Sequence, residues 1–193
     1  MAQALRLAVI LGSVRPGRKA EAVGRWVHRR ARRRDGIAVE LVDVAAHQLP
    51  VLDEPLPAAY GRYERPHTKA WSETIASFDG YVFVTPEYNR SIPGPLKNAI
   101  DYLYGEWHDK AAGFVSYGID AAGTRAVEHL RVVMSELRIA DVRAQVALSL
   151  SADFDGDTFR PLPHRDRELD VLLDQLTTWS RALRTVRRGQ DVQ

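Results

Sequence analysis

The sequence contains no cysteine among its 193 residues. This absence excludes disulfide bonds, thiolate nucleophiles and cysteine-ligated metals, and it fits a cytoplasmic protein. No apolar run is long enough to cross a bilayer, so we expect no membrane partner. The opening stretch MAQALRLAVILGS has a single basic residue and runs directly into a glycine turn, which favours a first strand over a signal peptide.

Several catalytic and metal-binding motifs are also missing. The chain has no G-x-S-x-G, which argues against the hydrolase nucleophile elbow, and its six histidines show no metal-ligand spacing. The acidic turn at residues 153–157 lacks the spacing of a calcium loop. Neither G-x-G-x-x-G nor a P-loop is present, which disfavours a dinucleotide or a nucleoside triphosphate bound in the usual way. We therefore expect no metal site.

The balance of charge is close to neutral. The formal net charge is +2 and the sequence pI is about 9.0, with arginines dense between residues 28 and 35. We interpret that segment as the solvated end of a helix, where cations also favour the helix dipole. A nucleic-acid partner is not expected, because no interleaved aromatics or recognition motif accompany the arginines.

Hydrophobic patterning predicts five strands that alternate with five helices. Such alternation gives a parallel sheet covered by helices on both faces, an α/β fold. We expect a single domain over residues 1–193, with a frayed tail after about residue 188. The strict alternation at residues 142–150 is typical of an edge strand. The predicted strands are 5–11, 37–44, 81–84, 111–117 and 142–150, and the predicted helices are 19–34, 67–78, 95–104, 122–138 and 166–188.

The stretch from residue 80 to 103 places a polar loop directly after a buried strand. Prolines in and beside the loop, residues 85–94, predict that it is stiff. Loops at the carboxyl ends of strands are where open α/β sheets bind ligands. Glu87, Tyr88, Asn89 and Ser91 provide enough hydrogen-bonding groups to recognise a flat polar ring. An ordinary strand-to-helix connection remains the alternative.

The loop after the first strand, residues 12–19, has the chemistry of a phosphate cradle. Glycines permit tight turns, and the following helix offers unpaired N–H groups at its positive end. Ser13 adds a hydroxyl, while Arg15, Arg18 and Lys19 add cationic donors. A monophosphate ligand fits this loop best, although a basic turn without a ligand remains open. Small residues at 115–118 would also let backbone approach a ligand.

Three segments together resemble a known family. LGSVRPGR at residues 11–18, TPEYNRSIPGPLKNAIDYL at 85–103 and VSYG at 115–118 resemble the NAD(P)H-dependent FMN reductases, which include flavin, quinone, azo-dye and chromate reductases. The likeness covers roughly residues 5–150. It implies a flavodoxin-like three-layer sandwich with a five-stranded parallel sheet.

The resemblance also implies which residues bind the cofactor. The first loop would hold the FMN phosphate, and Lys19-Ala20 stands where many members have a serine. The other two segments would line and flank the isoalloxazine ring. The implied cofactor-binding residues are Ser13, Arg15, Arg18, Lys19, Ala20, Pro86, Glu87, Tyr88, Asn89, Ser116, Tyr117 and Gly118.

The implied activity is a two-stage oxidoreduction. NADPH or NADH would pass hydride to bound FMN, and an acceptor such as free flavin, a quinone, an azo compound or a metal oxyanion would then take its place. No catalytic side chain is required. A flavodoxin-like electron carrier and a flavin-binding regulatory protein with little turnover are the alternatives. The family is usually dimeric or tetrameric, so we expect a homodimer or homotetramer. The aromatic residues crowded around the site and its helix indicate an interface, although core packing is the more common explanation for any one of them. They are Tyr88, Tyr102, Tyr104 and Trp107.

Overall fold

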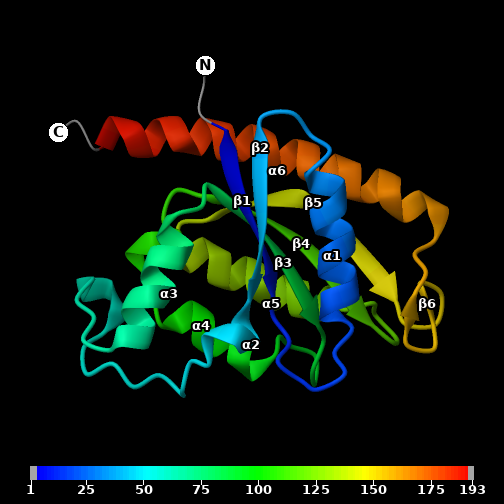
Figure 1. Ribbon diagram of the computed structural model, residues 1–193, viewed down its shortest axis with the longest axis horizontal. Coiled ribbons are helices and arrows are strands. Elements are labelled where there is room, and N and C mark those ends of the chain that lie inside the picture. Colours follow the sequence, from blue (N-terminus) through cyan, green and yellow to red (C-terminus); the bar gives the residue numbers. More distant parts are fainter. Residues whose placement is uncertain (1–3, 191–193) are drawn as a thin grey trace.

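A five-stranded sheet in the order β2-β1-β3-β4-β5 forms the centre of the computed structural model, which describes residues 4–190 (Figure 1). Every neighbouring pair of strands is parallel. This is the doubly wound order of flavodoxin-like folds, so the predicted α/β class is confirmed. The strands are β1 Leu5–Leu11, β2 Ile37–Asp43, β3 Gly80–Pro86, β4 Ala111–Gly118 and β5 Ala140–Ser149.

Helices cover both faces of this sheet and complete the three layers. Apolar residues of α1 and α6 pack on one face, while those of α3, α4 and α5 pack on the other (Figure 1). No helix within residues 4–190 is both long and apolar enough to cross a membrane. The helices are α1 Ala20–Ala31, α2 Val44–His47, α3 Pro66–Ala76, α4 Gly94–Asp101, α5 Thr124–Glu136 and α6 Pro163–Gln190, with 3₁₀ turns η1 Ala58–Tyr60 and η2 Gly105–Trp107.

The sequence pattern missed one short helix and two short strands, so the expected count of five helices was wrong. Helix α2 has only four residues, too few to show a helical period, and it is capped by the Asp43 carboxylate, which accepts the Ala45 N–H at 3.0 Å. The acidic turn at residues 153–157 contains a small hairpin made of β6 Phe154–Asp155 and β7 Thr158–Phe159. Two-residue strands likewise give no alternating pattern.

The ends of the chain's helices also differ from expectation. Helix α1 stops at Ala31 rather than residue 34, and the chain turns into β2 through Gly36, whose φ is +70°. Helix α6 begins three residues earlier than predicted, at Pro163. It continues through Gln190, past residue 188, where we expect the tail to fray; residues 191–193 lie outside the described part. Strand β5 lies at one edge of the sheet, as its alternation predicted, and β2 lies at the other.

The arginine-rich segment is not simply a solvated helix end. Arg30 binds Asp166 at 3.0 Å and also binds Asp170. Arg34 donates to the Asp170 carbonyl at 2.9 Å and binds Asp174. These two arginines form a row of ion pairs between α1 and α6, so their charges link the two helices.

Two of the aromatic residues expected near a subunit interface lie in the core instead. Tyr102 and Trp107 are each 0% exposed. The Trp107 indole N–H donates to the Ile100 carbonyl at 3.2 Å, and its ring lies edge-on to Tyr81. The interface assignment is therefore wrong for these two residues, because they fill the space between α4 and the sheet.

Lys110 is buried directly before β4, at the amino ends of the strands, whereas the predicted ligand-binding loops lie at their carboxyl ends. Its side chain is among the buried polar groups, and Nζ donates to the carbonyls of Ile75 at 2.9 Å and Ala76 at 3.1 Å and to the Tyr81 hydroxyl at 3.0 Å. These contacts tie Lys110 to carbonyls at the carboxyl end of α3, where helical hydrogen bonding runs out. Burial, with the nearby Arg187 charge, lowers the pKa of Lys110 to about 7.

This depressed pKa predicts a pH-dependent stability. An unfolded lysine titrates near 10.5, so between pH 7 and 9 the unfolded chain binds more protons than the folded one. The free energy of unfolding should therefore rise with pH, by up to about 1.4 kcal/mol per pH unit. Denaturant titrations at three pH values measure the slope. Lys110→Met should abolish it, while the exposed Lys97→Met should keep it; equal slopes in both variants would contradict the assignment.

Candidate functional site

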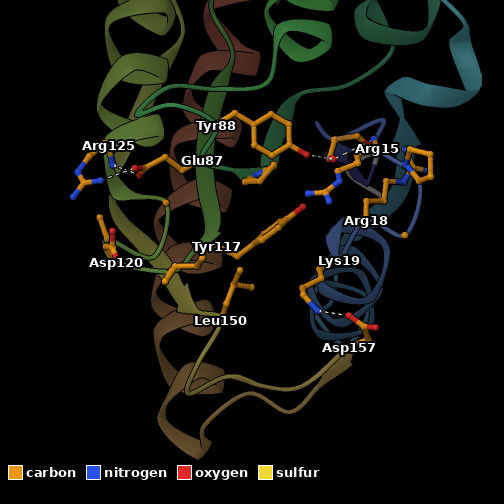
Figure 2. A pocket seen from close by; sticks show the side chains of 18 residues that line it. Arg15, Arg18, Lys19, Glu87, Tyr88, Tyr117, Asp120, Arg125, Leu150 and Asp157 are labelled. Atoms are coloured by element: carbon orange, nitrogen blue, oxygen red, sulfur yellow. Dashed lines mark hydrogen bonds and ion pairs between the residues drawn. The ribbon is translucent and has the colours of Figure 1, made fainter.

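A cavity of about 460 Å³ opens at the carboxyl edge of the sheet (Figure 2). This volume is in the range of small-molecule sites. Its walls come from the loops that follow β1, β3 and β4, with the tip of the β6–β7 hairpin at one end. The lining residues are Ser13, Arg15, Pro16, Gly17, Arg18, Lys19, Pro86, Glu87, Tyr88, Tyr117, Gly118, Ile119, Asp120, Ala121, Gly123, Arg125, Leu150 and Asp157.

The loop after β1 is shaped by a tight turn. The Arg18 N–H donates to the Arg15 carbonyl at 3.2 Å, with Pro16 and Gly17 between them. Gly17 has φ +67°, which together with proline at the preceding position defines a type II turn. Helix α1 then begins without a side-chain cap, so its first N–H groups point toward the loop unpaired by side chains.

Arg18 holds this loop together from inside. Its guanidinium donates to the Ser13 carbonyl at 2.6 Å, to Asp43 at 2.5 Å and to Glu21 at 3.3 Å. Burial opposes the charge, but the hydrogen bond with Asp43 and further acidic contacts raise the pKa of Arg18. Arg18 lines the cavity as predicted, yet its donors are committed to the protein rather than available to a ligand.

Lys19 and Arg15, the other two cations of the loop, differ in whether the protein already uses their donors. Lys19 Nζ donates to the Gly156 carbonyl at 2.9 Å, and it also donates to the Asp157 carboxylate at 2.9 Å (Figure 2). Arg15 is exposed, and within residues 4–190 its guanidinium has no hydrogen-bond or ion-pair partner. Arg15 is thus the loop cation whose charge is available to an anionic ligand.

The loop after β3 is closed by a tight hydrogen-bonded turn, and its predicted stiffness stays a prediction. Tyr88 and Ser91 exchange two backbone hydrogen bonds, of 2.8 and 3.0 Å. Between them Asn89 and Arg90 have φ of 49° and 68°, the geometry of a type I′ turn. The Tyr88 hydroxyl lies 3.1 Å from the Ser13 hydroxyl and so ties this loop to the loop after β1.

Glu87 is held by the start of α5. Its carboxylate accepts the Arg125 backbone N–H at 3.2 Å and the Arg125 side chain at 2.9 Å (Figure 2). The Glu87 side chain is only 11% exposed, so this ion pair neutralises a carboxylate that would otherwise face the cavity alone. The partners are 38 residues apart, and no local motif in the sequence indicated Arg125.

The turn after β4 depends on close backbone contact. A Cβ on Gly118 would lie 2.8 Å from the Gly123 N, and a Cβ on Gly123, whose φ is +81°, would lie 2.7 Å from the Ser116 Cβ. The buried Ser116 hydroxyl donates to the Ala122 carbonyl at 2.8 Å. Ser116 therefore supports the turn from beneath. Tyr117 lines the cavity, and burial raises the pKa of its hydroxyl.

Nine of the twelve predicted site residues line the cavity, and their roles there stay predictions. Three do not line it: Ala20 is buried in the first turn of α1, Asn89 is exposed at the tip of its turn, and Ser116 lies under the β4 turn. The cavity-lining residues that the sequence did not reveal are Pro16, Gly17, Ile119, Asp120, Ala121, Gly123, Arg125, Leu150 and Asp157. Pro16 and Gly17 lie inside the predicted loop; Leu150 and Asp157 come from the other end of the chain.

Comparison with known proteins gives a consistent result. Residues 5–153 match the protein-family model described as NADPH-dependent FMN reductase. The NAD(P)H-dependent FMN reductase ntnL of Nectria sp. is 40% identical over 157 residues, which cover 77% of this chain and 78% of that protein. A 2-hydroxy-1,4-benzoquinone reductase of Burkholderia sp. is 32% identical over 142 residues, covering 70% and 73%.

Solved structures agree on the fold. The flavoenzyme NAD(P)H:acceptor oxidoreductase FerB of Paracoccus denitrificans superposes with a TM-score of 0.70 at 21% identity, covering 91% of this chain and 98% of that one. At this identity the likeness supports the architecture alone.

The site geometry predicts opposite behaviour for two neighbouring arginines. Arg18→Met removes contacts to Ser13, Asp43 and Glu21, so it should lower the free energy of unfolding by about 1–3 kcal/mol. Arg15→Ala removes no internal side-chain contact and should change it by less than about 0.5 kcal/mol. Urea titrations of both variants measure this difference. Equal destabilisation would show that Arg18 does not brace the loop.

Proposed function

This chain belongs to the NADPH-dependent FMN reductase family, and we propose that it passes reducing equivalents from NADPH or NADH, through FMN in the described cavity, to a small-molecule acceptor. It is accordingly an oxidoreductase that uses FMN and NAD(P)H. One observation supports placing FMN in this cavity. The cavity has a cationic end at Arg15 for a phosphate, and the same cavity has a wall made of Pro86, Glu87 and Tyr88 for a flat ring.

The residues present fit FMN. A phosphate monoester needs N–H donors and positive charge, and the loop after β1 offers Arg15, the Ser13 region and the uncapped start of α1. A flat ring needs two firm walls with backbone groups. The Tyr88–Ser91 turn and the Gly118–Gly123 turn provide them, each held by short-range backbone packing.

The protein's part in the reaction is binding and orientation. FMN, when bound, supplies the redox chemistry by taking hydride from a nicotinamide and delivering electrons to an acceptor. Tyr88 and Tyr117 form walls of the ring site, and Arg125 neutralises the Glu87 carboxylate beside it. No side-chain acid, base or nucleophile is required, and we assign none.

The acceptor we propose first is a quinone. Relatives of this chain are described as quinone reductases, including the Burkholderia protein and a protein of Pseudomonas putida that is 34% identical over 135 residues. Free flavin, azo compounds and metal oxyanions remain candidates for the same site. A flavodoxin-like carrier or a regulatory flavoprotein would share the fold but would not turn over NAD(P)H.

Sequential occupation of one site predicts two separable half-reactions. Anaerobic NADPH or NADH should bleach the flavin absorbance of the FMN-loaded protein before any acceptor is present, and a quinone should then restore it. Steady-state rates should follow ping-pong kinetics. Stopped-flow absorbance measures each half, with free FMN as the control. If NADPH and NADH reduce the FMN-loaded protein no faster than they reduce free FMN, the proposed enzyme activity fails. An electron-carrier or regulatory function would then replace it.

Arg15 should contribute to FMN affinity through its charge. Loss of one charge-assisted contact costs about 1–3 kcal/mol, so Arg15→Ala should raise the FMN dissociation constant by roughly 5- to 100-fold. Riboflavin, which lacks the phosphate, should bind wild type and variant alike. Fluorescence titration with both flavins decides the matter. An unchanged FMN constant in the folded variant would remove Arg15 from the phosphate site.

We also propose that the chain acts as one FMN-binding domain, in the cytoplasm, as a homodimer or homotetramer. Exposed apolar side chains between β2 and α3 support assembly: Val51 is 87% exposed and Tyr60 is 67% exposed. Tyr88 and Tyr104 are partly exposed and remain compatible with an interface. Light scattering at working concentration measures the assembly, and a stable monomer would refute it.

A further inference from the structure

The β6–β7 hairpin is firmly anchored at its base. Asp153 is 0% exposed and accepts hydrogen bonds from Arg165 at 3.1 Å and from the Leu162 N–H at 3.0 Å. The rings of Phe154 and Phe159 pack in a tilted arrangement with their centres 5.0 Å apart, and Phe159 lies edge-on to Trp26 of α1. These contacts fix where the hairpin tip lies, beside the start of α1 at the end of the cavity.

The tip holds Lys19 by three contacts. Its ammonium donates to the Gly156 carbonyl and the Asp157 carboxylate, and it lies 5.1 Å from the centre of the Phe154 ring. The Lys19 side chain is 21% exposed, whereas that of Asp157 is fully exposed. Asp157 thus places an exposed negative charge at the cavity rim, and among the described residues its side chain pairs only with Lys19.

We propose that Asp157 competes with the ligand phosphate for Lys19 and so sets how readily a phosphorylated flavin binds and leaves. This inference rests on the proposed function, which places the FMN phosphate in the loop after β1. The family match ends at residue 153, so family membership assigns Asp157 no role.

Physical chemistry gives the direction of the effect. A phosphate monoester carries more negative charge than a carboxylate and has three acceptor oxygens, so it can take over the Lys19 ammonium. The exposed Asp157 side chain returns to water at little cost. Until it does, the carboxylate both occupies Lys19 and repels the incoming anion, and after phosphate departure it recaptures the ammonium. The Lys19 ammonium in turn lowers the pKa of Asp157, so the competitor stays ionised.

The test compares two flavins and two hairpin variants. Asp157→Asn should lower the FMN dissociation constant by about 3- to 5-fold, chiefly through a faster association rate, because the exposed ion pair no longer occupies Lys19 before the phosphate arrives. Riboflavin affinity should stay within about 2-fold, since riboflavin has no phosphate to compete. Asp155→Asn is the matched control, because Asp155 lies in the same hairpin but pairs with Arg160 at 3.0 Å. That variant should leave both constants unchanged.

A second background separates competition from simple repulsion. In Lys19→Met protein, Asp157→Asn should no longer tighten FMN binding. The proposal is overturned if Asp157→Asn still tightens FMN binding in Lys19→Met protein. It is also overturned if Asp157→Asn does not tighten FMN binding when Lys19 is present. Weaker FMN binding by Asp157→Asn would overturn it too, since it would make Asp157 a support for Lys19. If wild-type protein binds riboflavin and FMN with equal, negligible affinity, the proposed function itself fails, which is a different result.

Discussion

The parallel pairing of β1, β3 and β4 is the constraint on which the rest of the structure depends. Their register sets Leu11 opposite Val84 and Val84 opposite Val115, so the three strands end within three residues of the same level. The loops that follow must therefore meet at one edge, although they lie some seventy and thirty residues apart in the chain. Gly12 adds to this convergence: a Cβ there would lie 2.7 Å from Leu96, so its loop packs directly against α4.

Compensation of charge by the chain itself shapes the chemistry of that edge. Arg18 is satisfied by Asp43 and the Ser13 carbonyl, and Glu87 is satisfied by Arg125. Such pairs keep the walls rigid and avoid leaving uncompensated charge in a half-buried site. The positive groups that remain for an anionic ligand are Arg15 and the amino end of α1. In our proposal Lys19 joins them when the ligand phosphate displaces Asp157. A site built this way can hold an anion without collapsing around it.

The segment after β5 modifies this common arrangement. The hairpin lies outside the residues that match the family, yet its buried Asp153–Arg165 pair and its aromatic base fix it against α1. A short excursion on one side of the sheet thus reaches the phosphate end of the cavity. In folds of this class, tuning of ligand affinity by such peripheral segments is physically cheap, because it leaves the sheet and its register untouched.

Hydrophobic period and turn residues, by themselves, determined the five strands, the parallel sheet and two of the three loops that line the cavity. Those features are local: a buried strand, a glycine or proline turn and an amphipathic helix each have a signature within a dozen residues. The sequence also indicated the cations of the first loop, but not which of them is available. Tertiary structure decided that Arg18 braces the loop, that Arg125 pairs with Glu87, and that Asp157 holds Lys19. The reason is physical: an ion pair between residues up to 138 positions apart is set by where the folded backbone carries them, and nothing in the neighbouring sequence records it.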